Sequence, residues 1–293
     1  MKKSIIAIML LIAVVAGCFA LVGCDKEDPS TVKDGAYTIG VQSGTTGEYY
    51  VKGDADWGFD GYANNECKGY ANGGLAVQDM LNGKVDFVVI DEAPAKAIAA
   101  SAAFNGKVKV IDVPLTVEEY AFGVNKNDAD LLTKVNAFLT KIKGNGQFDA
   151  IMNKYFNGEE VTGIESADYD ANKAQLVVAT NAAFAPFEYK IGNKFAGIDM
   201  EIAALLAQEL NMELVIKDMD FDSVVISVGT EGIDIAMAGL TVNETRKQSV
   251  NFSSSYYNAA QVIIVKADDT IFDGCTTAEQ VEAILNGTDK VAE

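Results

Sequence analysis

Residues 85–91 read Val85-Asp86-Phe87-Val88-Val89-Ile90-Asp91, an apolar run that ends at a carboxylate. A short run of this kind is typical of a parallel strand buried on both faces. Further strand-like segments occupy 36–41, 108–113, 120–124, 176–180, 212–216, 233–237 and 261–265. Helix-like periodicity lies between several of them. The alternation of the two patterns predicts an α/β fold.

The helices are indicated by apolar side chains that recur every three or four residues. Residues 131–142, 148–155 and 198–206 show this spacing, and Asp199 is expected to cap the start of the third. A further helix is predicted over 276–286, with a Thr276 and Glu279 capping box. Residues 157–174 are polar and acidic and lose the periodicity, so we interpret them as a linker.

The N-terminus has the layout of a secretory signal. Two lysines precede the apolar stretch 4–21, and Leu21-Val22-Gly23-Cys24 then leads into a polar run. This ending resembles a bacterial lipobox, which predicts a lipidated Cys24 and a chain outside the cytoplasm. Cys18 fits the lipobox almost as well, and an uncleaved membrane anchor is the alternative to cleavage.

Composition narrows the classes of function. The net charge of −19 disfavours nucleic acid and anionic lipid headgroups as partners. The chain has no histidine, which excludes Ser-His-Asp and Cys-His triads and histidine-bearing metal sites. We therefore expect no cofactor and no metal. Cys67 and Cys275 are the cysteines beyond the leader, and they could form a disulfide or remain thiols.

Arg246 is the sole arginine among the 23 basic residues. A guanidinium differs from an ammonium in offering a planar, bidentate set of donors to a carboxylate. Arg246 follows the loop Gly239-Leu240-Thr241, where glycine allows a ligand to approach the backbone and Thr241 offers a hydroxyl. The alternative is a surface turn with an exposed arginine.

Two other loops follow strands, which is where open α/β sheets bind ligands. Ser43-Gly44-Thr45-Thr46-Gly47 could bind an anion through backbone N–H groups. Asp91 stands at the mouth of its strand, where it could pair with an ammonium group or cap the next helix. Together the three loops are complementary to an α-amino acid. Phe184 and Phe221 could flank its side chain, or belong to the core.

These motifs resemble the periplasmic polar amino-acid-binding proteins, type II solute-binding proteins of ABC transporters. The resemblance rests on Val178-Ala179-Thr180-Asn181, Pro186-Phe187-Glu188, Gly197-Ile198-Asp199, Asp220-Phe221-Asp222, the loop 239–246, Gln42-Ser43-Gly44-Thr45-Thr46 and Val88-Val89-Ile90-Asp91. It implies a two-lobed fold in which each lobe is a mixed sheet flanked by helices. Two crossing strands would join the lobes.

The resemblance also implies roles for single residues. Arg246 would bind the ligand α-carboxylate, helped by Thr241 and Thr46. Asp91 would hold the α-ammonium, assisted by the Gly239 carbonyl. Phe184 and Phe221 would cover the ligand, and Asn181 would meet its side chain. An uncharged residue at 181 weakly disfavours lysine or arginine as ligand.

The order of the two halves departs from the family, in which the segment like 175–293 comes first. We therefore predict a circular permutant, with 1–24 as signal and 25–34 as tether. Lobe 2 would be split between 35–114 and 263–293, and lobe 1 would run from 115 to 262, with 157–174 joining the family's usual termini. A truncated tandem duplication is the alternative.

The expected function is capture of a polar or neutral amino acid for an ABC importer permease by a monomer that is attached to the cell membrane through lipid only. A ligand-binding sensor and a dehydratase-like enzyme are the alternatives. We expect no enzymatic activity, because without histidine an acid–base pair would need Asp, Glu, Lys or Tyr, and no such pair stands out.

Overall fold

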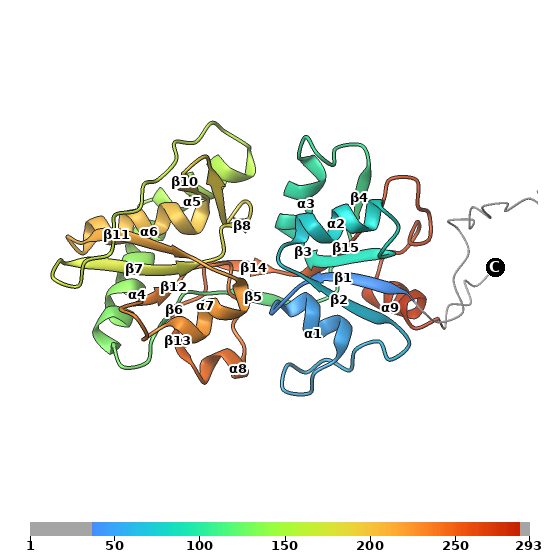
Figure 1. Ribbon diagram of the computed structural model, residues 1–293, viewed down its shortest axis with the longest axis horizontal. Helices are drawn as coiled ribbons and strands as arrows, with labels where there is room; N and C mark the ends of the chain where they lie inside the picture. The colour runs from blue at the N-terminus through green and yellow to red at the C-terminus, as the bar shows by residue number, and fades with distance from the viewer. Residues whose placement is uncertain (1–36, 288–293) are drawn as a thin grey trace, which may run out of the picture.

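The computed structural model describes residues 37–287, and the predicted signal 1–24, the tether 25–34 and Cys24 lie outside the described residues. The chain forms two lobes, each built on a five-stranded mixed sheet (Figure 1). This confirms the predicted α/β, two-lobed, periplasmic-binding-protein-like fold. Within 37–287, no helix is both long enough and apolar enough to cross a bilayer.

The lobe that we call lobe 2 carries a sheet in the order β2-β1-β3-β15-β4. Its strands are β1 (Thr38–Gln42), β2 (Glu66–Tyr70), β3 (Phe87–Asp91), β4 (Val108–Ile111) and β15 (Gln261–Lys266). Its helices are α1 (Thr46–Lys52), α2 (Gly73–Leu81), α3 (Glu92–Ala100) and α9 (Ala278–Leu285). Every residue of β3 is buried, as a central strand between helix layers requires.

The other lobe, lobe 1, carries a sheet in the order β11-β7-β12-β6-β13. Its strands are β6 (Gly123–Asn125), β7 (Gln175–Thr180), β11 (Glu213–Asp218), β12 (Ile235–Ala236) and β13 (Val250–Phe252). Its helices are α4 (Ala129–Gly144), α5 (Gln147–Phe156), α6 (Ile198–Glu209), α7 (Phe221–Ser227) and α8 (Glu244–Lys247). A smaller sheet holds β8 (Ala183–Phe184), β9 (Glu188–Ile191) and β10 (Lys194–Ala196).

A two-stranded antiparallel ribbon of β5 (Glu118–Tyr120) and β14 (Tyr257–Ala259) joins the lobes (Figure 1). The sequence predicts one strand over 120–124, and this prediction is wrong. The chain leaves the ribbon at Ala121, whose N–H bonds Leu240 O, and enters the lobe-1 sheet at β6. The change of partner divides the apolar run into two short strands.

One local prediction needs correction, and one question that the sequence left open is answered. The helix predicted over 276–286 is α9 (Ala278–Leu285), and its capping box lies one residue later than expected, because Thr277 is the N-cap and pairs with Gln280. Thr276 and Glu279 therefore do not make that box. Cys67 and Cys275 are not joined by a disulfide, although both side chains pack against the same apolar cluster of lobe 2.

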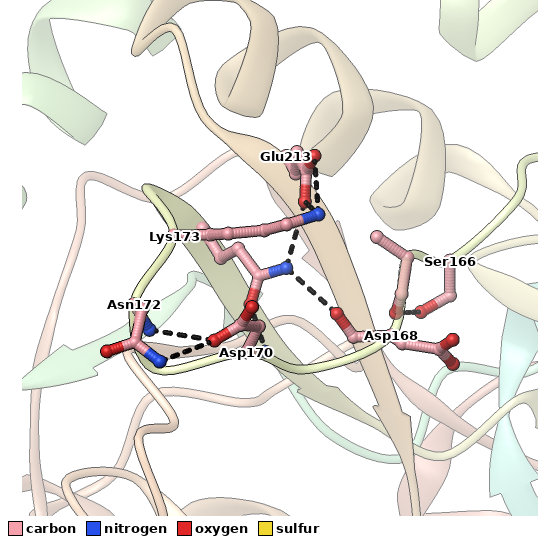
Figure 2. A network of polar contacts seen from close by, with 8 residues as sticks. Ser166, Asp168, Asp170, Asn172, Lys173 and Glu213 are labelled. Atoms are coloured by element: carbon pink, nitrogen blue, oxygen red, sulfur yellow. Dashed lines mark hydrogen bonds and ion pairs between the residues drawn. The ribbon is translucent and has the colours of Figure 1, made fainter.

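The segment 157–174 has no helix or strand but lies hydrogen-bonded along β11, an edge strand of lobe 1. Ala167 N donates to Leu214 O, and Ser166 Oγ accepts from Ile216 N. Figure 2 shows how its end is fixed: Lys173 and Glu213 form an ion pair of 3.1 Å, and Asn172 bonds Asp170. The segment therefore covers backbone groups that an edge strand would otherwise expose.

The two ends of the described chain meet in lobe 2. Asn65 Oδ1 accepts from Tyr37 N at 3.0 Å, and Asn65 Nδ2 donates to Leu285 O at 2.8 Å. One amide thus connects the start of β1 with the end of α9. The Tyr50 hydroxyl also bonds Glu282 of α9 at 2.9 Å.

Candidate functional site

The polar loops selected from the sequence meet where the lobes face each other. Loops after β1, β3 and β12 all open toward this seam. Two pockets lie along it: one is lined by Ile90, Pro94 and Ile98 of lobe 2 with Phe184 and Tyr189 of lobe 1. The other is lined by Ala71 and Asn72 of lobe 2 with Asn181, Met219, Asp220 and Ser223 of lobe 1. The seam is therefore hollowed and bordered by both lobes.

Arg246 is buried at the seam, in the short helix α8. The Asn243 side chain caps this helix by accepting from Arg246 N at 2.7 Å. Arg246 Nη1 donates to Thr241 O at 2.9 Å, and Nη2 donates to Gly44 O of lobe 2 at 3.0 Å. No carboxylate of residues 37–287 lies in ion-pair contact with it. A guanidinium has five N–H donors, so this group retains donors for a ligand carboxylate.

The guanidinium of Arg246 is in contact with two aromatic rings. Its Cζ is 5.2 Å from the centroid of Phe221 in lobe 1 and 5.0 Å from that of Trp57 in lobe 2. Burial lowers the pKa of Arg246 to about 10, which still leaves the group charged at neutral pH. Phe221 thus covers the arginine as well as bordering the seam.

Thr46 and Thr241 connect the lobes directly. Thr46 Oγ1 donates to Thr241 Oγ1 at 3.2 Å, and Thr241 Oγ1 donates to Glu118 Oε2 at 2.6 Å. Gln261 Nε2 donates to the other carboxylate oxygen of Glu118 at 3.0 Å. Glu118 therefore orients both a threonine of the site and the start of β15.

Asp91 ends β3 and is 4% exposed. It occupies the N-cap position of α3, but its side chain makes no cap hydrogen bond. The Tyr120 hydroxyl of the ribbon donates to Asp91 Oδ1 instead. Burial, followed by the charge of Glu118, raises the pKa of Asp91 to about 7. A buried carboxyl without a cation is suited to receive an ammonium group.

Asn181 is placed at the seam, yet its amide is already occupied. Its Nδ2 donates to Met219 O at 2.8 Å, and its Oδ1 accepts from Gln42 Nε2 of lobe 2 at 3.0 Å. Because Met219 O requires a donor, the orientation of both amides is set. Gln42 Oε1 is buried and has no protein partner among the described residues. Of the two amides, Gln42 thus retains an open acceptor.

Gly239 and Phe184 lie in contact across lobe 1. Gly239 has φ of 54°, and an added Cβ would stand 3.0 Å from Phe184 Cε1, so glycine permits this approach. Asp199 does not cap α6, whose N-cap is Gly197. It is fully buried and accepts from Gly239 N at 2.9 Å and the Tyr256 hydroxyl at 2.7 Å. Asp199 therefore supports the loop that leads to Arg246.

Glu188 of β9 is a buried carboxyl close to Asp199 and Asp91. It is 0% exposed, and neither carboxyl oxygen has a hydrogen-bond partner among the described residues. Burial and the nearby charges of Asp199 and Asp91 raise its pKa well above the ordinary range. No group of three or more His, Cys, Asp or Glu side chains within 37–287 could hold a metal ion.

Sequence reasoning brought Arg246, Thr241, Gly239, Asp91, Thr46, Asn181, Phe184 and Phe221 to the seam, and the structure places all eight there or directly behind it. It did not select Trp57 or Glu118, and it quoted Gln42 within a motif without giving that residue a role. Trp57 is the sole tryptophan of the chain, which is a signal that could have drawn attention to it. Glu118 and Gln42 carry no comparable local signal.

The fold is two-lobed, and the candidate site lies where the lobes face each other. Residues 176–291 match the family model of bacterial extracellular solute-binding proteins, family 3. The resemblance stated from the motifs is confirmed for this segment, which spans less than half of the chain.

Individual relatives agree with the family match. The chain is 35% identical over 109 residues to the arginine-binding extracellular protein ArtP of Bacillus subtilis (strain 168), covering 37% of this chain and 43% of that protein. It is 35% identical to a probable histidine-binding protein of Neisseria gonorrhoeae, covering 35% and 39%. The aligned stretch thus spans less than half the length of these relatives.

Among solved structures, an ancestral arginine-binding protein bound to arginine is 36% identical and covers 29% of this chain and 38% of that chain, with a TM-score of 0.28. The ancestral amino acid-binding protein AncCDT-1, a precursor of cyclohexadienyl dehydratase, is 12% identical and covers 88% and 90%, with a TM-score of 0.43.

Proposed function

We propose that this chain binds an amino acid between its two lobes, outside the cytoplasm, and passes it to the permease of an ABC importer. The observation that carries the proposal is the opposed pair of unneutralised groups: a buried arginine without a carboxylate partner and a buried aspartate without a cation, at one seam. Arg246 would take the α-carboxylate and Asp91 the α-ammonium. Thr241, Thr46 and the Gly239 carbonyl would complete the contacts.

Phe184 and Phe221 would border the ligand side chain, and Asn181 would meet it together with Gln42, whose Oε1 is the acceptor without a protein partner among the described residues. The relatives named for arginine and histidine keep both ligands in the panel to be tested. We also propose that the chain is a monomer and that it is anchored by a lipid at Cys24, with Cys18 as the alternative site.

The test is a thermal-shift and calorimetry screen of the chain from residue 25 onward against the common amino acids. A ligand that binds the native state alone raises the melting temperature. One amino acid should give a saturable shift and a measurable Kd. A cooperative melt with no shift from any amino acid would overturn the proposal. Turnover of a cyclohexadienyl substrate would favour the enzyme alternative, and binding without any permease interaction would favour sensing.

Ligand affinity should depend on the protonation of Asp91. This carboxyl, whose pKa burial raises to about 7, lies near Glu118, Tyr120 and Glu188 and must lose its proton to pair with an ammonium. Below pH 7 the association constant should therefore decrease as the pH falls, by up to about tenfold per pH unit. Above pH 7 it should be nearly constant. Calorimetry from pH 5 to 8.5 measures this. Asp91→Asn should weaken binding at pH 8 and remove the dependence, and exposed Asp112→Asn should leave the wild-type profile.

We also propose that the chain is a circular permutant with lobe 2 split between 35–114 and 263–293, lobe 1 spanning 115–262, and 157–174 linking the ancestral ends. The pairing of β3 with β15 supports a lobe 2 built from two separate segments of one chain. The Asn65 bridge between Tyr37 and Leu285 supports a direct ancestral connection at this point.

A relinked chain tests the permutation. It would run from residue 175 through 287, continue through a short Gly-Ser joint into 37, and end at 156. Lobe 2 keeps its contacts and lobe 1 loses those that 157–174 makes along β11, so we expect a cooperative melt at a somewhat lower temperature and the same ligand preference. The original chain with the same joint inserted into 157–174 serves as the control. A relinked chain that fails to fold while this control folds would contradict the proposal.

A further inference from the structure

Trp57 is held in a closed turn of lobe 2 rather than in a loose loop. Asp54 and Phe59 pair as an antiparallel bridge, and an Asp54 carboxylate oxygen accepts from Trp57 N at 3.2 Å and from Asp56 N at 2.9 Å. The indole stacks on Tyr49 of α1, with ring centroids 4.1 Å apart and an interplanar angle of 18°. The position of the ring is therefore set by lobe 2 alone.

The Arg246 guanidinium of lobe 1 also lies over the Trp57 ring. Its Cζ lies 5.0 Å from the Trp57 centroid, and Phe221 approaches it to 5.2 Å. A guanidinium is attracted to the faces of aromatic rings, and tryptophan gives the strongest such contact. With rings near its carbon, the N–H groups at the edge of the plane remain to meet a carboxylate.

Arg246 is thus contacted from both lobes at once. Lobe 1 supplies Phe221 and Thr241 O, and lobe 2 supplies Trp57 and Gly44 O. Separation of the lobes would remove the two lobe-2 contacts together. Any ligand held by this arginine is therefore sensitive to how lobe 2 closes on it.

On the basis of the proposed function, we propose that Trp57 is a positioning residue that aligns Arg246 for the ligand carboxylate and couples that contact to closure of lobe 2. The residue does not need to touch the ligand. Its contribution passes through the guanidinium, so it should be specific for ligands that carry a free α-carboxylate.

The test compares Trp57→Leu, Trp57→Phe and a matched control, Phe59→Leu, which removes an aromatic ring from the same turn without touching Arg246. Calorimetry is run with the amino acid that gives the largest thermal shift and with its α-carboxamide. Trp57→Leu should weaken amino-acid binding by about tenfold. Trp57→Phe should stay within about threefold, Phe59→Leu should retain the wild-type Kd, and the carboxamide should lose little in any variant.

The coupling to Arg246 is measured by a double-mutant cycle. In an Arg246→Lys background, Trp57→Leu should have an effect at least threefold smaller than in wild type, because the planar group is gone. Equal losses for amino acid and carboxamide, or full additivity with Arg246→Lys, would overturn the positioning role while leaving amino-acid binding intact.

A ligand-free readout separates this inference from the proposed function. Trp57 is the sole tryptophan, so the emission of the native protein reports its surroundings alone. Arg246→Gln should shift that emission and its accessibility to a quencher even without ligand. Unchanged emission would mean that the stack does not form in solution, whatever the protein binds. If the emission shifts but no amino acid binds, the stack stands, the proposed function fails, and the carboxylate-positioning role fails with it.

Discussion

Arg246→Ala is expected to weaken amino-acid binding by at least about 100-fold. The guanidinium is buried at the seam, is contacted by backbone carbonyls of both lobes, and retains donors for a carboxylate. Removing one member of a buried, hydrogen-bonded charge pair costs about 2–5 kcal/mol, and each 1.4 kcal/mol is a factor of ten in affinity. The thermal shift produced by the ligand should therefore disappear at concentrations that saturate the wild type.

Two variants make the result interpretable. Arg246→Lys keeps the charge but not the planar fork, so it should bind with an intermediate Kd. Lys247→Ala removes the adjacent exposed cation, which pairs with Glu244, and should leave Kd unchanged. The melting temperature of each ligand-free variant shows whether the fold survives. A folded Arg246→Ala protein with wild-type affinity would show that the carboxylate is bound elsewhere.

Glu188→Gln should stabilise the protein at neutral and alkaline pH while changing little near pH 4. The Glu188 carboxyl is fully buried without a hydrogen-bond partner among the described residues, and its pKa is raised well above the ordinary range by burial and by Asp199 and Asp91. The native state therefore keeps a proton that the unfolded chain releases above about pH 4.3. Stability is complete below that pH and is lost as the pH rises toward the folded-state pKa.

The size of the effect follows from linkage. Each buried acid with a raised pKa lowers the free energy of unfolding by up to about 1.4 kcal/mol per pH unit in this window. Burial raises the pKa values of Asp91 and Asp199 to about 7, so these two groups add to the loss of stability with rising pH up to about pH 7. At pH 7.5 we expect Glu188→Gln to raise the free energy of unfolding, by at most about 4 kcal/mol, and to raise Tm with it.

Thermal melts from pH 4 to 8.5 measure this difference. The wild type should lose stability steadily as the pH rises through the window, and the variant should lose less. Glu119→Gln, at an exposed ribbon position, is the matched control and should follow the wild type. A variant no more stable than wild type at pH 7.5 would mean that Glu188 is ionised and paired in the folded protein.

Local sequence patterns were enough to predict much of the secondary structure, because the interactions behind them join residues that are close in sequence. The buried run at β3 and the spacing of Leu131, Val135, Phe138 and Ile142 specify their elements whatever surrounds them. The loop 239–246 could be proposed as a carboxylate site because glycine, hydroxyls and a sole arginine occur within eight residues.

What the sequence determined by itself was therefore the α/β class, most of the elements, the family resemblance and the set of polar loops. Only the tertiary structure decided the division of 118–125 between ribbon and sheet, the role of Asp199 behind Gly239, and the pairing of Gln42 with Asn181. It also brought Trp57 to Arg246, 189 positions later in the chain by 246 − 57. These contacts join residues that are distant in sequence, and no local propensity encodes which of them will meet when two lobes pack together.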